Sequence, residues 1–377
     1  MFDRPSAGTR ALLIQVDFGQ GGIEERLSEV GLLATSAGAS VVGVVQCRRQ
    51  APDPALYIGK GKADEIRMAA QLDEADIVIF NHDISAAQQR NLERVLERRV
   101  IDRSALILDI FALRAKSHEG KLQVELAQLQ HLSTRLVRGW THLERQKGGI
   151  GLRGPGEKQL ETDRRLLGER VKLLKSRLTQ LERQRGVRRR ARERRDVLTV
   201  SLVGYTNAGK STLFNALTKA GAYAADQLFA TLDTTSRRLF LGEAGNIVLS
   251  DTVGFIRDLP HSLVAAFHAT LEETVAADVL LHVVDSSSED REGQIAAVNG
   301  VLEEIGAGSL PQIQIWNKID ATLASPEVQR DACGNISRVL LSAKTGEGLG
   351  LLRQVLSDIA LAHKASLVAT SVTQDSV

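Results

Sequence analysis

The sequence predicts an α/β fold with an N-terminal α/β domain, an antiparallel helical hairpin and a C-terminal P-loop domain on a mostly parallel sheet. Strand-like apolar runs alternate with helical stretches over residues 10–117, a pattern typical of α/β domains. Leucines then recur at helical spacing on both sides of a glycine-rich break, and a later apolar run leads into a phosphate-binding loop. We therefore predict four parts, at residues 1–117, 118–195, 196–363 and a flexible tail at 364–377.

The N-terminal part has three strand-like runs, Leu12–Val16, Val41–Val45 and Asp76–Phe80, and a helical stretch at Ile84–Glu97. Their alternation favours a small α/β domain. The segment Gly59-Lys60-Gly61-Lys62 lacks a complete P-loop. It fits either a phosphate or RNA contact or a basic turn at the start of a helix, because so short a motif has little specificity.

Two helices with apolar seams flank the glycine-rich segment and predict an antiparallel hairpin. The tip of this hairpin, Gly148–Gly156, contains five glycines and Arg153. Such a tip can approach a folded RNA closely, or it can be a flexible connection without special function. The seam residues are Leu122, Leu126, Leu129, Leu132 and Leu136 in the first helix and Leu160, Leu167, Val171, Leu174, Leu178 and Leu181 in the second.

An arginine-rich run follows the hairpin. Residues Arg183–Arg195 include eight arginines and one acidic residue, Glu193. Attraction to a nucleic-acid backbone is the natural use of so many guanidinium groups, although a solvated helix face or linker has the same composition.

The segment Gly204-Tyr205-Thr206-Asn207-Ala208-Gly209-Lys210-Ser211 matches the P-loop pattern. The apolar run Val197–Val203 before it is predicted to be a buried strand, and the residues from Ser211 onward a helix. Strand, loop and helix N-terminus together offer backbone N–H groups to phosphate oxygens. We expect Lys210 to reach the β- and γ-phosphates and the Ser211 hydroxyl to ligate Mg²⁺.

The identity of the nucleotide base is predicted by the segment Asn317-Lys318-Ile319-Asp320, which follows the apolar strand Ile313–Trp316. A carboxylate at a strand's C-terminal end can accept two hydrogen bonds from guanine, and adenine lacks that pair of donors. We expect Asn317 to hold the neighbouring loop and the acceptor edge of the base, and the Lys318 stem to cover the ring face. Ser342-Ala343-Lys344 follows a later strand, and a backbone N–H near Ala343 is expected to contact the guanine oxygen.

Two more segments complete the predicted phosphate site. The strand Ile247–Ser250 ends in Asp251-Thr252-Val253-Gly254, where Asp251 is expected to hold Mg²⁺ through water and the Gly254 N–H to sense the γ-phosphate. The loop Phe229-Ala230-Thr231-Leu232-Asp233 offers Thr231 to close over Mg²⁺ and the γ-phosphate, although Thr231 also fits an ordinary loop residue.

Phe255 follows Gly254, at a position where many GTPases carry a glutamine that orients the attacking water. A phenyl ring cannot hydrogen-bond that water, so we expect slow hydrolysis unless a partner or another residue helps. Phe255 also fits simple packing of the switch region, and both interpretations can hold together.

Several long segments resemble those of the HflX-type GTPases, and the resemblance covers nearly all of residues 10–360. It implies a Mg²⁺-dependent hydrolase that converts GTP to GDP and phosphate. It also implies binding to the large ribosomal subunit and its rRNA, splitting or rescue of idle or stalled ribosomes, and release on GTP hydrolysis. For the N-terminal domain it raises a second nucleotide-binding or ATP-dependent RNA-remodelling activity. The segments are Tyr57–Lys62, Asn81–Asp83, Val100–Arg103, Ser117–Gln123, Gly148–Glu157, Phe229–Asp233 and Asp251–His261.

The predicted site is therefore assigned residue by residue. Lys210, Thr231 and Gly254 are the expected catalytic residues, and Ser211, Thr231 and, through water, Asp251 are the expected Mg²⁺ ligands. GTP contacts are expected along the whole of Gly204–Ser211, Phe229–Asp233, Asp251–Gly254, Asn317–Asp320 and Ser342–Lys344.

Composition bounds the alternatives. The chain has 377 residues, and 43% of them are apolar, which suffices for more than one hydrophobic core. Its net charge is +2. Cys47 and Cys333 lie far apart and outside any CxxC pattern, which favours buried free thiols in a reducing compartment. The first residues, Met1–Pro5, show neither the basic start nor the apolar core expected of a signal peptide, and no apolar run approaches the ~20 residues that span a bilayer.

We accordingly expect a cytoplasmic monomer without stable membrane insertion, bound to GTP or GDP. The alternative function is a regulatory GTPase switch that acts on a protein or membrane partner, because arginine runs also suit acidic surfaces.

Overall fold

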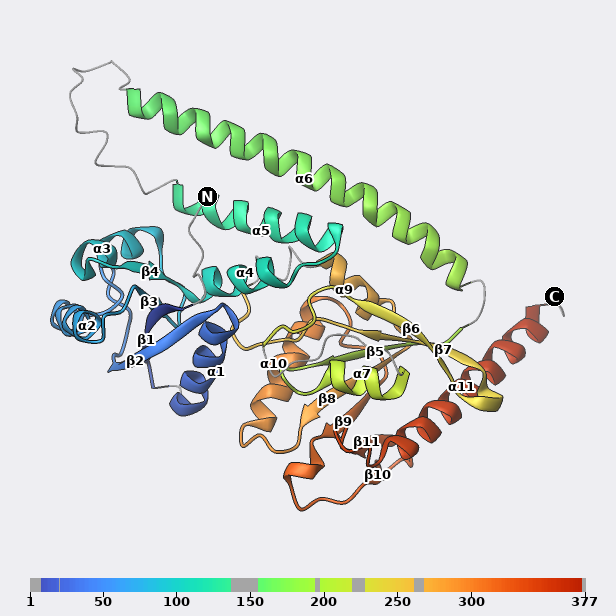
Figure 1. The fold of residues 1–377 in the computed structure, drawn as a ribbon. Helices are drawn as coiled ribbons and strands as arrows, with labels where there is room; N and C mark the ends of the chain where they lie inside the picture. Colours follow the sequence, from blue (N-terminus) through green and yellow to red (C-terminus); the bar gives the residue numbers. More distant parts are fainter. Residues whose placement is uncertain are drawn as a thin grey trace. The chain divides into compact units, whose positions relative to one another are not determined.

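Two largely parallel β-sheets organise the residues that the computed structural model describes, which are 8–19, 21–136, 155–193, 197–218, 228–260 and 268–374. The chain divides into two compact units, Met1–Thr179 and Gln180–Val377. Each unit contains one of the sheets (Figure 1). This architecture confirms the predicted α/β fold, with the P-loop in the second sheet's domain.

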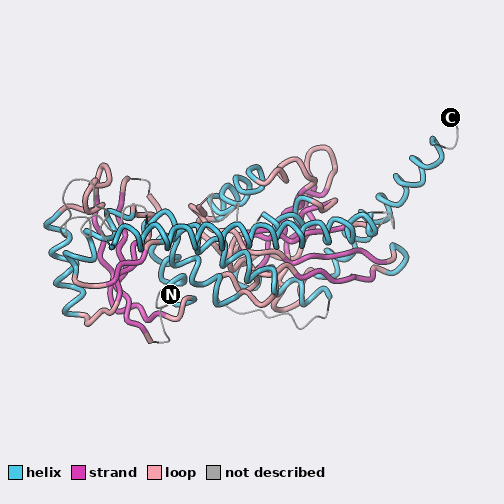
Figure 2. Tube along the Cα trace, turned by 90° about the horizontal axis from the view of Figure 1, so that it is seen from above, coloured by secondary structure: helices cyan, strands magenta, loops and turns pink. Residues whose placement is uncertain are grey.

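The sheet of the first unit has the strand order β2-β1-β3-β4, with all pairs parallel. Helices lie on both sides of the strands (Figure 2), with α1 packed against α4 and α2 against α3. β1 is buried along most of its length, because it lies inside the sheet and both faces are covered. The strands are Thr9–Asp17 (β1), Ala39–Arg48 (β2), Ile77–Phe80 (β3) and Arg99–Ile101 (β4), and the helices are Ile23–Ser36 (α1), Lys60–Leu72 (α2), Ala86–Leu96 (α3) and Arg103–Arg114 (α4).

Polar caps begin two of these helices. The Ser85 hydroxyl accepts a hydrogen bond from the Gln88 N–H at 3.3 Å, while the Gln88 side chain accepts one from the Ser85 N–H at 2.9 Å. This reciprocal pair is a capping box that fixes the start of α3. Asp102 is the N-cap of α4, since its carboxylate accepts the Ala105 N–H at 2.9 Å.

The hairpin consists of α5 (His118–Leu136) and α6 (Pro155–Glu193), which lie side by side and run in opposite directions (Figure 1). An ion pair joins them, because Arg170 Nε lies 2.7 Å from Glu125 Oε1. Four leucines of the predicted seams are buried, namely Leu122, Leu126, Leu174 and Leu178.

Two boundaries of the hairpin differ from the prediction. α6 begins at Pro155, so the last two residues of the predicted loop Gly148–Gly156 are helical. Proline suits a first helical position, where no intrahelical N–H bond is lost. The rest of that loop lies outside the described residues. The arginine run predicted as a linker continues α6 as far as Glu193, because arginine is a good helix former.

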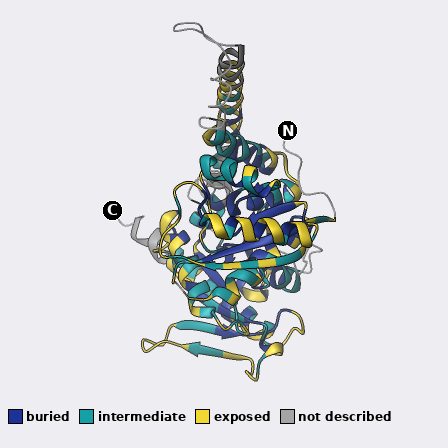
Figure 3. Ribbon diagram, turned by 90° about the vertical axis from the view of Figure 1, so that its left-hand side faces the viewer, coloured by how far each residue is buried: buried dark blue, intermediate teal, exposed yellow. Residues whose placement is uncertain are grey.

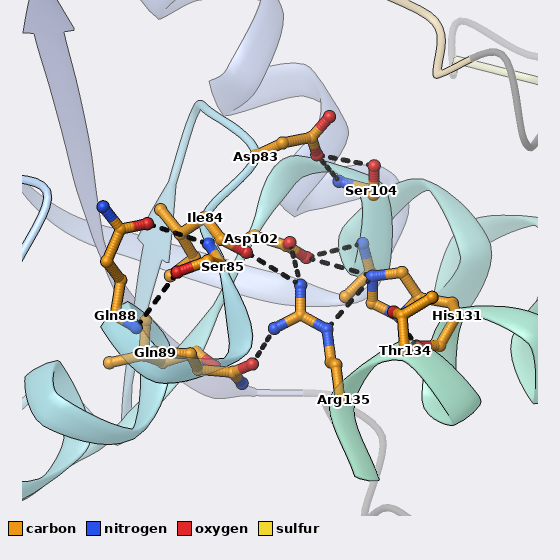
Figure 4. Close-up of polar contacts among 12 residues, drawn as sticks. Asp83, Ile84, Ser85, Gln88, Gln89, Asp102, Ser104, His131, Thr134 and Arg135 are labelled. Atoms are coloured by element: carbon orange, nitrogen blue, oxygen red, sulfur yellow. Dashed lines mark hydrogen bonds and ion pairs between the residues drawn. The ribbon is translucent and has the colours of Figure 1, made fainter. Parts of the chain in front are cut away.

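A buried ion pair docks α5 onto the α/β domain. The Arg135 guanidinium donates to the carboxylate of Asp102 and to the side-chain oxygen of Gln89 (Figure 4). His131 lies one helical turn earlier, with Nε2 3.8 Å from Asp102 Oδ1. Burial acts to raise the pKa of Asp102, but His131 and Arg135 outweigh it and hold the pKa below its usual value.

The sheet of the second unit has the order β10-β11-β9-β8-β5-β7-β6. The inner pairs are parallel, whereas β10–β11 and β6–β7 are antiparallel. The strands are Thr199–Gly204 (β5), Thr235–Phe240 (β6), Asn246–Asp251 (β7), Val279–Asp285 (β8), Gln312–Asn317 (β9), Glu327–Arg330 (β10) and Ile336–Leu340 (β11).

Helices cover both faces of this sheet. α7 (Lys210–Thr218) and α11 (Leu349–Gln374) contribute leucines and Phe214 to an apolar core on one face. α9 (His268–Val275) and α10 (Arg291–Glu304) contact β5 and β8. In Figure 3 buried residues gather on inner strands and exposed residues on the outward sides of helices, whereas the outer strands β2 and β10 are largely exposed or half-buried. The inner strands β5 and β8 are buried along nearly their whole length, because helices cover both faces of the sheet.

Two further predictions need correction. α11 continues to Gln374, so most of the tail predicted at residues 364–377 is helical, since alanine and leucine carry the helix past His363. Cys333 is exposed beside the β10–β11 turn, where Asp331 accepts its N–H, and Cys47 is half-buried. Both thiols are free. Among the described residues, no helix combines the length and apolar character needed to cross a membrane.

The Asp102 ion pair generates a prediction about stability. Asp102→Asn keeps a capping side chain but removes the charge that pairs with Arg135. We expect a loss of about 1.5–3 kcal/mol in unfolding free energy at pH 7. The folded pKa is lowered, so this stabilisation is present above the unfolded pKa of about 4 and is lost as pH falls through the folded pKa.

Urea unfolding of parent and variant at pH 7 and in acid measures this difference. Asp64→Asn is the matched control, since Asp64 makes only an exposed pair with Arg67 in the described contacts. An Asp102→Asn effect that is equally large in acid would contradict the prediction.

Candidate functional site

The predicted nucleotide-binding segments meet at one edge of the second sheet. β5, β7, β8, β9 and β11 are parallel, so their C-terminal ends lie at the same edge. β5 has β8 on one side and β7 on the other, which makes the loop after β5 a topological switch point. Open α/β sheets bind ligands at such a point.

The two outer glycines of the P-loop are required by close approaches. Gly204 has φ +149°, and a Cβ atom there would lie 2.2 Å from the carbonyl oxygen of Val283. Gly209 has φ +93°, and its Cβ atom would lie 2.2 Å from Asn317 Nδ2. Both conformations disfavour other residues. The loop therefore lies directly on β8 and β9, and α7 starts at Lys210 immediately after it.

Lys210 is buried at the floor of the site. Its Nζ donates to the carbonyl oxygens of Gly204 at 3.0 Å and Tyr205 at 2.8 Å. Burial lowers the pKa of Lys210 to about 8, and the nearby Asp251 carboxylate partly opposes the shift. An anionic ligand would therefore be attracted by a cation that water screens poorly. The pocket above it is lined by Thr206, Asn207, Gly209, Lys210, Ser211, Thr212, Phe229, Ala230, Thr231, Thr252 and Gly254.

Three predicted Mg²⁺ ligands lie together beside this pocket. The Ser211 hydroxyl is 2.6 Å from Thr231 Oγ1 and donates to Asp251 Oδ2 at 2.7 Å. Thr231 Oγ1 donates to the same carboxylate oxygen at 3.1 Å. The other oxygen, Asp251 Oδ1, is buried without a hydrogen-bond partner in the described structure. Burial raises the pKa of Asp251, which Ser211 and Lys210 oppose. Clustered oxygen donors with spare acceptor capacity fit a hard divalent cation such as Mg²⁺.

The segment after Asp251 packs directly against the P-loop. A Cβ atom at Gly254 would lie 2.9 Å from Thr206 Cγ2, so a larger residue would displace the loop. Phe255 is only 1% exposed; its N–H donates to the Gly204 carbonyl at 3.1 Å, and its carbonyl accepts the Thr206 N–H at 2.7 Å. The phenyl ring belongs to the hydrophobic core, and it does not line the pocket above Lys210.

Asn317 joins the base-binding loops to the P-loop. Its Nδ2 donates to the Ala208 carbonyl at 2.9 Å, and its Oδ1 accepts the Ala343 N–H at 2.9 Å. The predicted contact to the guanine oxygen was a backbone N–H near Ala343, and the N–H of Ala343 itself is bonded to Asn317. Asp320 is exposed, and its Oδ1 accepts a hydrogen bond from Ser342 at 2.6 Å.

Some positions of the predicted contact segments serve packing instead. Leu232, Val253 and Ile319 are buried hydrophobic residues. Gly59-Lys60-Gly61-Lys62 belongs to the first unit, where Gly59 precedes α2 and Lys62 Nζ lies 2.7 Å from Glu65 Oε1. That motif therefore forms a basic helix start.

The structure adds two residues that sequence reasoning missed. Asp285 is the last residue of β8 and lies 2.7 Å from Lys318 Nζ, and Ser286 follows it and donates to the Asn317 carbonyl. The available signal was a carboxylate directly after the apolar run Val279–Val284, at the strand end where ligands bind in parallel sheets.

Family profiles match most of the chain. The profile described as "GTP-binding GTPase N-terminal" matches residues 24–112, "GTP-binding GTPase Middle Region" matches residues 114–192, and "50S ribosome-binding GTPase" matches residues 199–318. "GTPase HflX" of Escherichia coli K12 is 57% identical over 95% of this chain and 84% of its own length. The protein of the same name from Magnetococcus marinus is 48% identical over 93% of this chain and 82% of its own length.

A solved structure shows the same fold. The crystal structure of SsGBP in complex with GDP aligns with 94% of this chain and 99% of its own, with a TM-score of 0.51 and 24% identity.

The position of Asp320 predicts base selectivity. Asp320→Asn replaces an acceptor by a mixed donor and acceptor, so preference should shift from guanine to xanthine nucleotides, with a loss of ~10²-fold or more in GTP affinity. Titration with GTP and xanthosine triphosphate measures the shift, and Asp358→Asn, at an exposed position of α11, is the control. Unchanged GTP affinity together with no xanthosine triphosphate binding would remove Asp320 as the base reader.

The Lys210 ammonium predicts phosphate dependence. Lys210→Ala should impair GTP binding, hydrolysis or both without unfolding the chain, because Lys210 faces the phosphate pocket. Turnover assays and circular dichroism test both parts, with exposed Lys175→Ala as the control. Full GTP turnover by Lys210→Ala would overturn the P-loop assignment.

Proposed function

This chain belongs to the GTPase HflX family, and we propose that it binds the large ribosomal subunit in its GTP form and splits idle or stalled ribosomes. It is a GTP hydrolase. Hydrolysis would release it from the ribosome and so complete a cycle. The observation that carries the GTPase part is the convergence of Ser211, Thr231 and Asp251 beside Lys210 at one sheet edge.

The proposed chemistry is positioning and charge neutralisation. Ser211, Thr231 and, through water, Asp251 would hold Mg²⁺, which supplies charge neutralisation at the β- and γ-phosphates when bound. Lys210 would exchange its bonds to the P-loop carbonyls for phosphate oxygens. Thr231 and the Gly254 N–H would close around the γ-phosphate, which orders the site for attack by water.

Burial of Phe255 bears on the rate of this reaction. Its ring is core, and it offers no hydrogen bond to a water molecule. Orientation of the water would therefore come from a partner or from another residue of the chain. We expect the ribosome to supply it, as activating partners do for other GTPases, with stimulation of ~10³–10⁵-fold.

Docking on rRNA is supported by charge. α6 continues through residues 183–193, a stretch that carries six of the eight arginines of the arginine-rich run. The family profile over residues 199–318 is described as a 50S ribosome-binding GTPase. A helix of this composition favours phosphate backbones, and its contribution should weaken steeply with salt through counterion release.

The hairpin tip provides the test. Replacing Gly149 and Gly151 by valine, or Arg153 by glutamate, should abolish ribosome splitting but preserve basal GTP hydrolysis, because the nucleotide site lies in the second unit. These three positions lie outside the described residues, so this prediction rests on the sequence alone. Gly168→Val on α6 is the matched control, because no atom lies within 4 Å of a Cβ atom there.

Light scattering of intact ribosomes mixed with GTP-loaded protein measures splitting. GTP turnover is compared in parallel with purified large subunits and with anionic vesicles. Splitting by the tip variants at the parent's rate would reduce the hairpin to a spacer. Turnover that rises with vesicles and ignores large subunits would favour the alternative of a switch on a membrane partner.

A further inference from the structure

The end of β8 forms a braced carboxylate next to the guanine-binding segment. Asp285 Oδ2 lies 2.7 Å from Lys318 Nζ, and the two side chains are only 18% and 31% exposed. The other oxygen, Asp285 Oδ1, accepts hydrogen bonds from the Ser287 N–H at 3.0 Å and the Ser287 hydroxyl at 2.6 Å. Ser287 therefore fixes the orientation of the carboxylate, and the carboxylate in turn holds the Lys318 ammonium.

Ser286, which lies between Asp285 and Ser287, holds the backbone of the segment that contains Lys318. Ser286 donates twice to the carbonyl oxygen of Asn317, from its N–H at 2.9 Å and from its hydroxyl at 2.6 Å. The Ser286 carbonyl accepts a hydrogen bond from Arg291 at 3.2 Å, and the Arg291 guanidinium lies 4.2 Å from the centre of the Trp316 ring. The end of β8 thus holds the Asn317 carbonyl, while Arg291 at the start of α10 holds the neighbouring Ser286 and Trp316.

The backbone conformation of Lys318 is a second reason to hold this residue in place. Lys318 has φ +65° and ψ +34°, a left-handed conformation that is uncommon for a residue with a Cβ atom. This conformation places Lys318 between the strand end at Asn317 and the short helix that begins at Ile319. An ion pair at the end of its side chain is a direct means of holding it there.

We infer that Asp285 is a positioning residue for guanine recognition, which fixes the Lys318 side chain over the base position before the nucleotide binds. Ser286 supports it by fixing the Asn317 carbonyl. The inference rests on the proposed assignment of guanine recognition to Asn317–Asp320. A pre-organised lysine stem loses less conformational freedom on binding, so it contributes more affinity than a mobile one.

The position of Asp285 predicts a particular pattern of effects. Lys318 covers the face of the ring, whereas Asp320 reads its edge. Loss of Asp285 should therefore lower the affinities for GDP and for GTP by the same factor, about 10-fold, because both nucleotides carry the same base. In the Asp320→Asn background, loss of Asp285 should lower the affinity for xanthosine diphosphate by the same factor.

A double-mutant cycle on the full-length protein tests the coupling. Dissociation constants of GDP and GTP are measured for the parent, Asp285→Ala, Lys318→Met and the double variant. We expect the double variant to bind within about twofold of Lys318→Met, since Asp285 acts through Lys318. Asp285→Glu should recover part of the lost affinity by restoring the carboxylate.

Asp278→Ala is the matched control at the opposite end of β8. Asp278 accepts hydrogen bonds from the Thr199 N–H and hydroxyl, both at 2.7 Å, and contacts no residue of the base-binding segment in the described structure. Its loss tests the stability of the strand without touching recognition, so nucleotide affinity should stay at the parent's value.

The outcomes separate this inference from the assignment beneath it. Additive effects of Asp285→Ala and Lys318→Met, or equal losses of affinity in Asp285→Ala and Asp278→Ala, would overturn the positioning role. If Asp320→Asn switches base preference while Lys318→Met leaves affinity unchanged, the inference fails and guanine recognition by Asp320 stands. If Asp320→Asn also leaves preference unchanged, the assignment itself fails.

Discussion

The side-chain amide of Asn317 holds together the three loops of the nucleotide site. The amide donates to the Ala208 carbonyl of the P-loop and accepts the Ala343 N–H of the last loop. The backbone carbonyl of Asn317 accepts a hydrogen bond from Ser286. Asn317 is only 2% exposed, so an unpaired amide there would be costly. One buried residue thus determines how far apart the phosphate and base regions lie.

The parallel strands place Asn317 where this is possible. β5, β8 and β9 are neighbours in the sheet, and Asp285 lies opposite Asn317 in the strand register. Gly209 permits the contact, since any Cβ atom there would collide with the Asn317 amide. The sheet register, the glycine and the asparagine therefore form one constraint. A change in any of them would shift the others.

Sequence reasoning succeeded where a signal is local. The strands before the P-loop and before Asn317 are apolar runs, and the leucine seams of α5 and α6 follow a helical period. It failed where a contact depends on distant register. Asp285 and Lys318 meet only because β8 and β9 align, and Arg135 reaches Asp102 from a different helix. The exposure of Cys333 likewise depends on tertiary surroundings that residue type alone does not specify.

The tryptophan next to Asn317 gives the site a built-in optical signal. Trp316 lies beneath two guanidinium groups, with Arg338 3.8 Å and Arg291 4.2 Å from its ring centre. Indole emission depends on nearby charge, and both cations sit on elements other than β9. Relative displacement of β9, β11 or the start of α10 would alter the emission of this indole. The spectroscopic environment of Trp316 is therefore tied to the strand that ends at Asn317, so it records the geometry of that strand without an added dye.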